Sequence, residues 1–368
     1  MGKTFVFFKC LQTLPKGTNV LFLAETKVRK NTVIDDAKFF KQVYSVDPFV
    51  GYNIKFALYQ SAWKHDIQYY FPNSRSTFIC CDEIHDLLTD KRILFILNSK
   101  LDNVKLLGLT ATIDRKTKYL VQGEEVTKIE LINRFCPVIY SYTINSAIED
   151  KTTRELKFFV VKHELDTKRN LETGTKKQRW TTSEKLQYEY LDKEFKRCLF
   201  IPLSDPNRDF RIMMAASKRA NFLYNLKSKT DECKKLVKHI KGKTLVFGQS
   251  NKELLDICPT AIVQDNPNLV KDLEDFKSGK TLLSCSNKIL RQGENIPNLD
   301  NVVLHSYYSK WGPLTQMLGR LRQSSNLGYV IMFITSNTQE EKWFQSATEN
   351  LKSEWIYCTS VDQLIERL

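Results

Sequence analysis

Short apolar runs that alternate with helical patterns, in two separate blocks of the chain, constrain the fold most. In the first block, residues 1–140, the runs are Asn19–Ala24, Ser76–Cys81 and Val104–Gly108. They are apolar nearly throughout rather than alternating, as strands buried on both faces of a parallel sheet are. The first block therefore predicts a parallel sheet with helices on both faces.

The second block repeats this pattern after Pro202 and Pro206. Helical stretches such as 209–240 and 267–278 separate its apolar runs. The runs are Lys243–Phe247, Thr260–Val263, Thr281–Ser284, Asn301–His305 and Tyr329–Ile334. Repeated βα units in two blocks predict an α/β protein with two doubly wound domains in tandem.

The segment between the blocks differs from them in composition and pattern. Its run Lys157–Lys162 predicts a strand, Gly174 lies in a polar turn, and Glu184–Arg197 reads as a helix. Residues 151–181 hold nine Lys and Arg against four acids, a net of +5. We expect domains at 1–142 and 206–368, with a basic insertion or linker at 143–205.

Two interpretations of this basic segment remain open. It is either a solvated hairpin or a basic finger that binds nucleic acid. In the second case Lys168, Arg169, Lys176 and Lys177 contact phosphates and Trp180 stacks on a base.

Charge points to a polyanionic partner. The 368 residues carry 56 Lys and Arg against 42 Asp and Glu, a formal net charge of +14. Such an excess favours nucleic acid first and a membrane surface second, although a generally basic proteome also produces it. No apolar run approaches the 18 residues that a membrane helix needs, so we expect no segment to span a membrane. We expect nucleic acid and not a membrane as the partner.

The nine cysteines are scattered, with no pair at zinc-binding spacing. This pattern argues against a disulfide framework and predicts a reducing compartment, the cytoplasm.

The strongest chemical signal is Cys81-Asp82-Glu83-Ile84-His85, directly after a predicted strand. In an open α/β sheet, ligands bind beyond the carboxyl ends of the strands. One carboxylate there can hold Mg²⁺ on ATP phosphates, and its neighbour can activate the attacking water. The alternative is an acidic loop that starts a helix, because acids also favour helix N-termini.

A second signal stands at the start of the chain. Gly2-Lys3-Thr4 supplies the last three residues of a phosphate-binding loop, in which glycine N–H groups, a Lys and a Thr reach the phosphates and Mg²⁺. The triplet is weak alone, since Gly-Lys-Thr recurs at 242–244. We expect the first loop glycine and its strand to lie upstream of residue 1, so that the ATP site is cut there.

The motif at 81–85 is followed by Gly108-Leu-Thr-Ala-Thr112, and this pair resembles motifs II and III of superfamily 2 DExH helicases. Five further segments are similar to the family's other motifs, in the family's order. They are Gly2–Thr4 (motif I), Leu21–Thr26 (Ia), Thr244–Phe247 (IV), Gly293–Pro297 (V) and Gln316–Arg322 (VI). Phe56–Ser61 resembles the nucleic-acid-contacting segment after motif Ia. The resemblance covers the chain except its middle and is nearest to helicases of tailed phages and large DNA viruses, which would place the protein in the host cytoplasm.

The resemblance implies two RecA-like domains and a set of roles in the first of them. Lys3, with Gly2, would bind ATP phosphates, Thr4 and Asp82 would hold Mg²⁺, and Glu83 would be the catalytic base. His85, Thr110 and Thr112 would couple hydrolysis to movement. Thr26 and Gln60 would contact nucleic acid.

In the second domain the resemblance assigns Gly293 and Asn295 to ATP and Asn287 to the nucleic-acid backbone. Gln316 would face His85, and Arg320 or Arg322 would be the arginine finger. This chain departs from the family's pattern here, with Gln323 where the last motif VI Arg is usual. Asn295 and Asn287 replace an Asp and a Thr.

The implied function is an ATP-dependent nucleic-acid helicase or translocase, with ATP and Mg²⁺ and with DNA favoured over RNA. Two alternatives stay open. One is a truncated or split-gene fragment that binds nucleic acid and needs a second polypeptide to complete its ATP site. The other is a translocase that does not separate strands.

Overall fold

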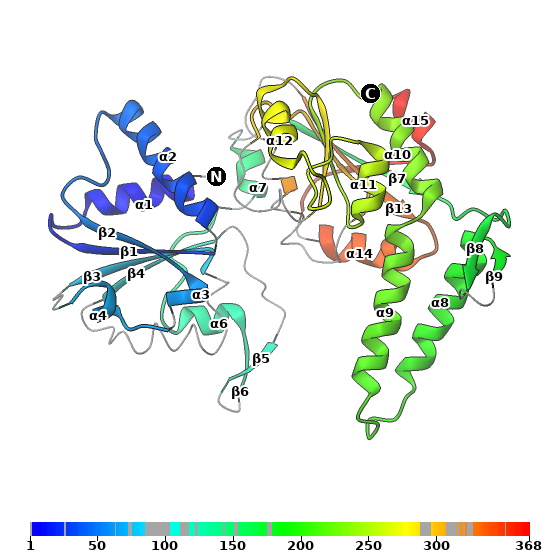
Figure 1. Ribbon diagram of the computed structural model, residues 1–368, viewed down its shortest axis with the longest axis horizontal. Coiled ribbons are helices and arrows are strands. Elements are labelled where there is room, and N and C mark those ends of the chain that lie inside the picture. The colour runs from blue at the N-terminus through cyan, green and yellow to red at the C-terminus, as the bar shows by residue number, and fades with distance from the viewer. Residues whose placement is uncertain are drawn as a thin grey trace. The chain divides into compact units, whose positions relative to one another are not determined.

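The computed structural model describes most of the chain in two units. The described residues are 2–25, 27–62, 64–72, 76–84, 104–110, 118–121, 124–142, 144–150, 154–174, 179–287, 296–306, 314, 317–318, 321, 327–349 and 351–368. Residues 1–141 and 142–368 form two compact units. Each unit is built on its own parallel sheet, which confirms the predicted α/β class (Figure 1).

The first unit has a four-stranded sheet in the order β2-β1-β3-β4. The strands are β1 (Asn19–Ala24), β2 (Asn53–Leu58), β3 (Thr77–Asp82) and β4 (Val104–Leu109). All three pairings are parallel, so the carboxyl ends of the strands share one edge. Asp82 pairs with Leu109 at this edge, and β3 is buried along its whole length.

Helices cover both faces of this sheet (Figure 1). On one face lie α1 (Lys3–Gln12) and α2 (Lys27–Tyr44). On the other lie α3 (Tyr59–Ala62), α4 (Ile67–Tyr70) and α6 (Lys128–Asn133). A short antiparallel pair, β5 (Lys118–Val121) and β6 (Glu124–Thr127), precedes α6.

Apolar spacing in α1 explains how this helix is placed. Thr4, Phe7, Phe8 and Leu11 are its buried residues, and they follow the i, i+3, i+4, i+7 spacing of one helical face. This face packs with Phe22 of β1 in a hydrophobic core of the unit. The packing fixes the axis of α1 and therefore the position of its first turn.

The second unit has a six-stranded parallel sheet in the order β11-β10-β12-β13-β7-β14. The strands are β7 (Leu156–His163), β10 (Thr244–Phe247), β11 (Leu283–Ser286), β12 (Asn301–Leu304), β13 (Gly328–Thr335) and β14 (Trp355–Cys358). β7 lies within the segment 143–205, which the sequence predicts to be an insertion or linker, yet it is part of this sheet. The strand pairs along eight residues with β13, because its central residues are apolar and need a partner on both sides.

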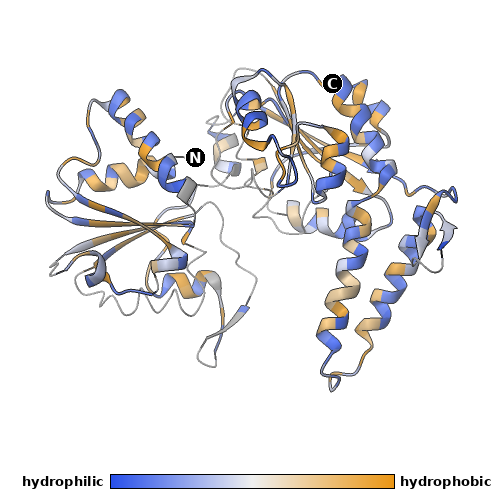
Figure 2. Ribbon diagram, viewed as in Figure 1, coloured by the Kyte–Doolittle hydropathy of each residue, from blue (hydrophilic) through white to orange (hydrophobic). Residues whose placement is uncertain are grey.

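Two cores lie on the two faces of this sheet. One core includes Leu236 of α10 (Lys227–His239), Leu254 of α11 (Asn251–Ile257) and Leu364 of α15 (Val361–Ile365). The other includes Phe276 of α12 (Leu269–Ser278) and Phe344 of α14 (Gln339–Thr348). The short α7 (Ile144–Glu149) precedes the sheet. Figure 2 shows the apolar colour concentrated on the strands and on the helix sides that face them.

An arm projects from the second unit (Figure 1). It consists of the antiparallel pair β8 (Leu171–Gly174) and β9 (Arg179–Thr182) and the long helices α8 (Glu184–Leu199) and α9 (Arg208–Tyr224). Arg219 of α9 pairs with Asp192 of α8 and fastens the two helices to each other. The Tyr188 hydroxyl accepts a hydrogen bond from the backbone N–H of Gln339, at 2.8 Å, which ties α8 to the start of α14.

Two further predictions about this unit are wrong. The helical stretch 209–240 is two helices, because Leu226 adopts an extended backbone and buries its side chain with Tyr188 and Leu223. The run Thr260–Val263 is not a strand and makes a single bridge, between Ile262 and Ser286.

No helix in the described residues is long and apolar enough to cross a membrane.

Candidate nucleotide-binding site

The first turn of α1 meets the carboxyl end of β3. Gly2 precedes the helix with φ at +80°, a left-handed conformation that glycine adopts without strain. The Lys3 ammonium forms an ion pair with Oε1 of Glu83, across 80 residues of sequence. The two predicted motifs at 2–4 and 81–85 are therefore in contact, which local sequence alone does not require.

Asp82 is the most buried acid at this edge. It is 3% exposed, and its backbone carbonyl accepts a hydrogen bond of 2.7 Å from the Tyr59 hydroxyl. Oδ2 of Asp82 accepts from Nε of Arg29, whereas the buried Oδ1 has no hydrogen-bond partner among the described residues. An orphaned carboxylate oxygen in a buried position is a site for a further donor or a cation.

Glu83 turns away from the strand direction with φ at +52°, which is uncommon for a residue other than glycine. Its Oε2 accepts a hydrogen bond of 3.2 Å from Oγ1 of Thr110, the residue that follows β4. A side chain at Gly108 would place its Cβ 2.4 Å from Cδ1 of Ile84. The glycine therefore lets β4 approach the turn after β3 and brings Thr110 to Glu83.

Arg29, near the start of α2, is a residue that the sequence reasoning missed. Its Nη2 donates to Oγ1 of Thr4 at 3.0 Å, while its Nε binds Asp82. Burial alone lowers the pKa of Arg29, but the Asp82 carboxylate outweighs this and the pKa lies above its ordinary value. The only sequence signal was a basic residue in the helix that follows Leu21–Thr26, in a chain with 56 Lys and Arg.

The donor set fits Mg²⁺. The Thr4 hydroxyl and the Asp82 carboxylate are hard oxygen ligands. They lie close together, since both accept hydrogen bonds from the guanidinium of Arg29. No group of three or more His, Cys, Asp or Glu that could hold a metal occurs in the described part of the chain. This agrees with Mg²⁺ in phosphate sites, where one or two protein ligands share the ion with water and substrate.

The other predicted residues are more dispersed. Gln60 is exposed on α3, and Asn287 of the second unit donates its side-chain amide to Asn251. Lys168 and Arg169 are exposed before β8, and Trp180 is 51% exposed on β9. The remaining predicted residues lie outside the described part: Thr26, His85, Thr112, Lys176, Lys177, Gly293, Asn295, Gln316, Arg320 and Arg322.

Arg154 fixes the segments that flank two of the predicted motifs. Its guanidinium is buried and donates to the Leu299 carbonyl at 2.6 Å, to Asp300 at 3.2 Å and to the Leu327 carbonyl at 3.4 Å. Lys243 adds a hydrogen bond of 2.9 Å to the Pro297 carbonyl. The chain after 293–297 and after 316–322 is thus fastened to the core of the second unit.

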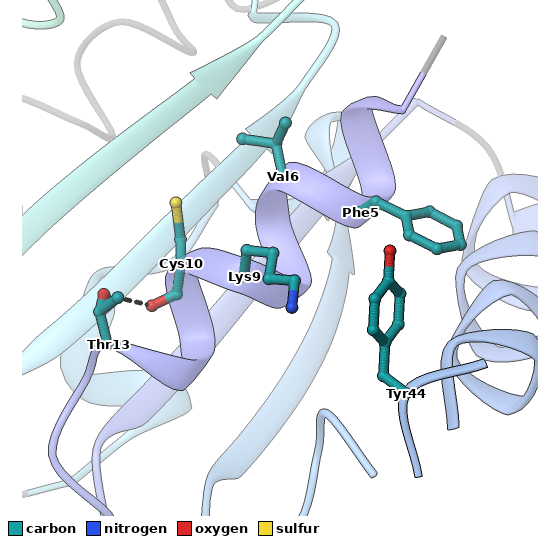
Figure 3. A pocket seen from close by; sticks show the side chains of 6 residues that line it. All are labelled: Phe5, Val6, Lys9, Cys10, Thr13 and Tyr44. Carbon is teal, nitrogen blue, oxygen red and sulfur yellow. Dashed lines mark hydrogen bonds between the residues drawn. The ribbon is translucent and has the colours of Figure 1, made fainter. Parts of the chain in front are cut away.

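A shallow apolar hollow lies on the outer side of α1 (Figure 3). Its lining residues are Phe5, Val6, Lys9, Cys10, Thr13 and Tyr44. Lys3, Asp82 and Glu83 do not line it, so this hollow is separate from the acidic edge of the sheet.

Residues 1–115 match the family model described as "Type III restriction enzyme, res subunit". This segment contains Lys3, Thr4, Arg29, Asp82, Glu83 and Thr110. No curated protein matches the chain.

Solved structures with a similar fold include a helicase domain, an RNA-bound protein and a restriction-modification enzyme. The Hef helicase domain of Pyrococcus furiosus is 15% identical with a TM-score of 0.53, and the match covers 94% of this chain and 92% of that one. Dbp5 of S. cerevisiae, bound to RNA and ADP BeF3, is 10% identical with a TM-score of 0.58 over 100% of this chain and 86% of that one.

The ATP-dependent Type ISP restriction-modification enzyme LlaBIII, bound to DNA, is 15% identical with a TM-score of 0.59. The match covers 100% of this chain but 30% of that enzyme. These likenesses show the fold, an α/β architecture of two RecA-like domains.

Proposed function

We propose that the chain is a nucleic-acid-dependent ATPase that translocates on DNA or unwinds it, with its catalytic centre at Lys3, Thr4, Asp82 and Glu83. The contact between Lys3 and Glu83 carries this proposal. It joins a helix N-terminus, a place suited to phosphate, to two acids at the carboxyl end of a parallel strand. The family-model match over residues 1–115 supports the same assignment.

Each side chain has a role that follows from its surroundings. Lys3 neutralises Glu83 in this structure, so a phosphate that attracts Lys3 frees the Glu83 carboxylate to accept a proton from water. Thr110 then holds the freed carboxylate through Oε2. Thr4 and Asp82 would hold Mg²⁺, which when bound neutralises charge on the phosphates.

For the second unit we propose the roles that the resemblance implies. Gly293 and Asn295 would bind ATP, Arg320 or Arg322 would be the arginine finger on the γ-phosphate, and Gln316 would relay nucleotide state. Arg154 acts on these residues indirectly, because it fixes Leu299 and Leu327 close to them in sequence. His85 and Thr112 would link nucleotide state to movement.

Nucleic acid would bind mainly through backbone phosphates. Lys168 and Arg169 are exposed, and Trp180 presents an exposed ring beside Arg179 on β9. Lys176, Lys177, Thr26, Gln60 and Asn287 complete the proposed contacts. DNA is proposed as the substrate on the match to a restriction-enzyme subunit and on the likeness to LlaBIII, a structure bound to DNA.

The test is ATP turnover by this chain alone and with single-stranded DNA, duplex DNA or single-stranded RNA. We expect turnover that rises with single-stranded DNA more than with RNA. If no nucleic acid stimulates turnover, the chain is not an autonomous ATPase, and an added second polypeptide that restores turnover would identify a split site. A strand-displacement assay then separates unwinding from translocation alone.

A further inference from the structure

Arg29 holds both residues to which we assign Mg²⁺. Its guanidinium donates to Oδ2 of Asp82 through Nε and to Oγ1 of Thr4 through Nη2. The side chains of Arg29 and Asp82 are 18% and 4% exposed, so water screens this pair little. A buried carboxylate needs a countercharge, and in the nucleotide-free protein Arg29 supplies it.

Oδ1 of Asp82 has no partner among the described residues, but a magnesium ion on Thr4 and Asp82 would lie next to the Arg29 guanidinium. Oδ2 of Asp82 and Oγ1 of Thr4 face the guanidinium, and a magnesium ion on these ligands would bring a second, denser positive charge next to it. Repulsion between the two cations therefore favours movement of Arg29 away from these ligands when Mg²⁺ binds.

A second acid lies within reach of Arg29 on its own helix. Asp36 is seven residues further along α2, on the same helical face, and its Oδ2 lies 4.0 Å from Nη1 of Arg29. The Asp36 side chain is 36% exposed, so an arginine paired with it meets solvent. Asp36 thus offers a second position for the displaced guanidinium.

We propose that Arg29 is an internal cation that competes with Mg²⁺ for Thr4 and Asp82, and that it moves to Asp36 when the Mg²⁺-nucleotide binds. The exchange keeps Asp82 neutralised in both states and makes Mg²⁺ affinity depend on Arg29. This inference rests on the Mg²⁺ site of the proposed function, but it concerns binding and not hydrolysis.

Binding of the metal alone tests the inference without nucleotide. Thermal unfolding is followed during titration with Mg²⁺, and Mn²⁺ binding is followed by electron paramagnetic resonance. We expect Arg29→Gln to have a lower melting temperature than wild type without metal, and to bind the metal about tenfold more tightly, within the usual range of couplings between sites. Asp36→Asn should bind the metal more weakly than wild type, because the displaced arginine loses its second partner.

The matched control is Lys38→Gln, which removes one positive charge from an exposed position of α2. Its metal affinity should equal that of wild type, which excludes a general charge effect. Arg29→Gln with Asp82→Asn should lose the tighter binding. Should Arg29→Gln fail to fold, Arg29→Lys is measured in the same way. Its metal affinity should rise by less than tenfold, because an ammonium keeps the positive charge but cannot bind both oxygens as the planar guanidinium does.

Equal or weaker metal binding by Arg29→Gln overturns the inference. The proposed function fails separately, when wild-type chain with nucleic acid hydrolyses no ATP. If metal affinity shifts in Arg29→Gln but the wild-type chain hydrolyses no ATP, the exchange is supported and the proposed ATPase function is wrong. If the chain hydrolyses ATP but the affinity does not shift, the ATPase function is supported and the exchange is wrong.

Discussion

The ammonium of Lys229 lies 2.8 Å from Oε1 of Glu340, and the two side chains are 0% and 1% exposed. The second carboxylate oxygen of Glu340 accepts from the backbone N–H of Thr335 at 2.9 Å. This ion pair joins α10 to the end of β13 and the start of α14 inside the second unit. Because its charges are removed from water, each depends on the other for compensation.

Replacing Lys229 by Met should destabilise the second unit strongly. The substitution removes the positive charge beside the buried Glu340 carboxylate, and breaking such a pair costs about 3–5 kcal/mol. The free energy of unfolding in urea measures the loss. In the double variant with Glu340→Gln, part of the loss should return, since no charge remains and the amide oxygen can still accept from Thr335.

Lys252→Met is the matched control, because Lys252 is exposed on α11 of the same unit. It should change the free energy of unfolding by less than about 0.5 kcal/mol. A similar small change for Lys229→Met would show that Glu340 finds another way to lose its charge.

His305 should make the protein less stable in mild acid. Its pKa is well below the ordinary value, first because the ring is buried and then because Lys229 and His163 lie near. The unfolded chain therefore takes up a proton at this residue near pH 6.5 that the folded chain does not, so stability falls as pH drops below about 6.5. The limiting slope for one group is about 1.4 kcal/mol per pH unit.

His305→Gln should flatten this pH dependence, because glutamine does not titrate and its side-chain amide can still form a hydrogen bond with Oγ1 of Thr230. The measurement is the free energy of unfolding at several pH values between 5 and 8. The slope of the free energy of unfolding against pH tests the prediction. The absolute free energy does not, since the substitution also disturbs packing. An unchanged slope in the variant would assign the acid sensitivity to other groups.

Elements whose residues pack along their whole length could be predicted from the sequence. The run Asn19–Ala24 became β1 over the same residues, because five of its six side chains are buried. Elements whose ends depend on a single polar contact could not be predicted in this way. Thr260–Val263 reads as a strand, but the Asn266 amide binds the Ala261 carbonyl at 2.7 Å and turns the chain.

The strand β11 begins two residues later than the sequence predicts. The backbone N–H groups of Lys280 and Thr281 both donate to the Asp275 carbonyl and complete the end of α12. Arg29 was missed for a related reason. Nothing in its local sequence distinguishes it from other basic residues. Its role arises only because the fold brings its side chain to Asp82 at the end of β3 and to Thr4 of α1.

Glu83→Gln should abolish ATP hydrolysis while sparing nucleotide binding. Glutamine keeps an oxygen for Thr110 but cannot accept a proton from water, and loss of a general base lowers turnover by about 10²–10⁴-fold. The turnover number and the affinity for ADP are measured side by side. Glu125→Gln is the matched control, because Glu125 is an exposed acid on β6 of the same unit and has no assigned role. Surviving turnover in Glu83→Gln would place the base elsewhere.

The basic segment before α8 should contribute to affinity for DNA through charge. Replacing Lys168, Arg169, Lys176 and Lys177 by Ala should weaken binding to single-stranded DNA and make it less sensitive to salt. Each lost phosphate contact reduces the slope of log affinity against log salt by about 0.7, so the four together reduce it by about 3. Fluorescence anisotropy at several salt concentrations measures both quantities.

Two comparisons separate this segment from a general loss of charge. Replacing Lys252 and Lys271, exposed on α11 and α12, should leave the slope unchanged. Trp180→Ala should weaken binding by about 1–3 kcal/mol while keeping the salt slope, because stacking on a base releases no counterions. If the fourfold variant binds as wild type does, residues 151–181 are a solvated hairpin and the excess positive charge serves another surface of the chain.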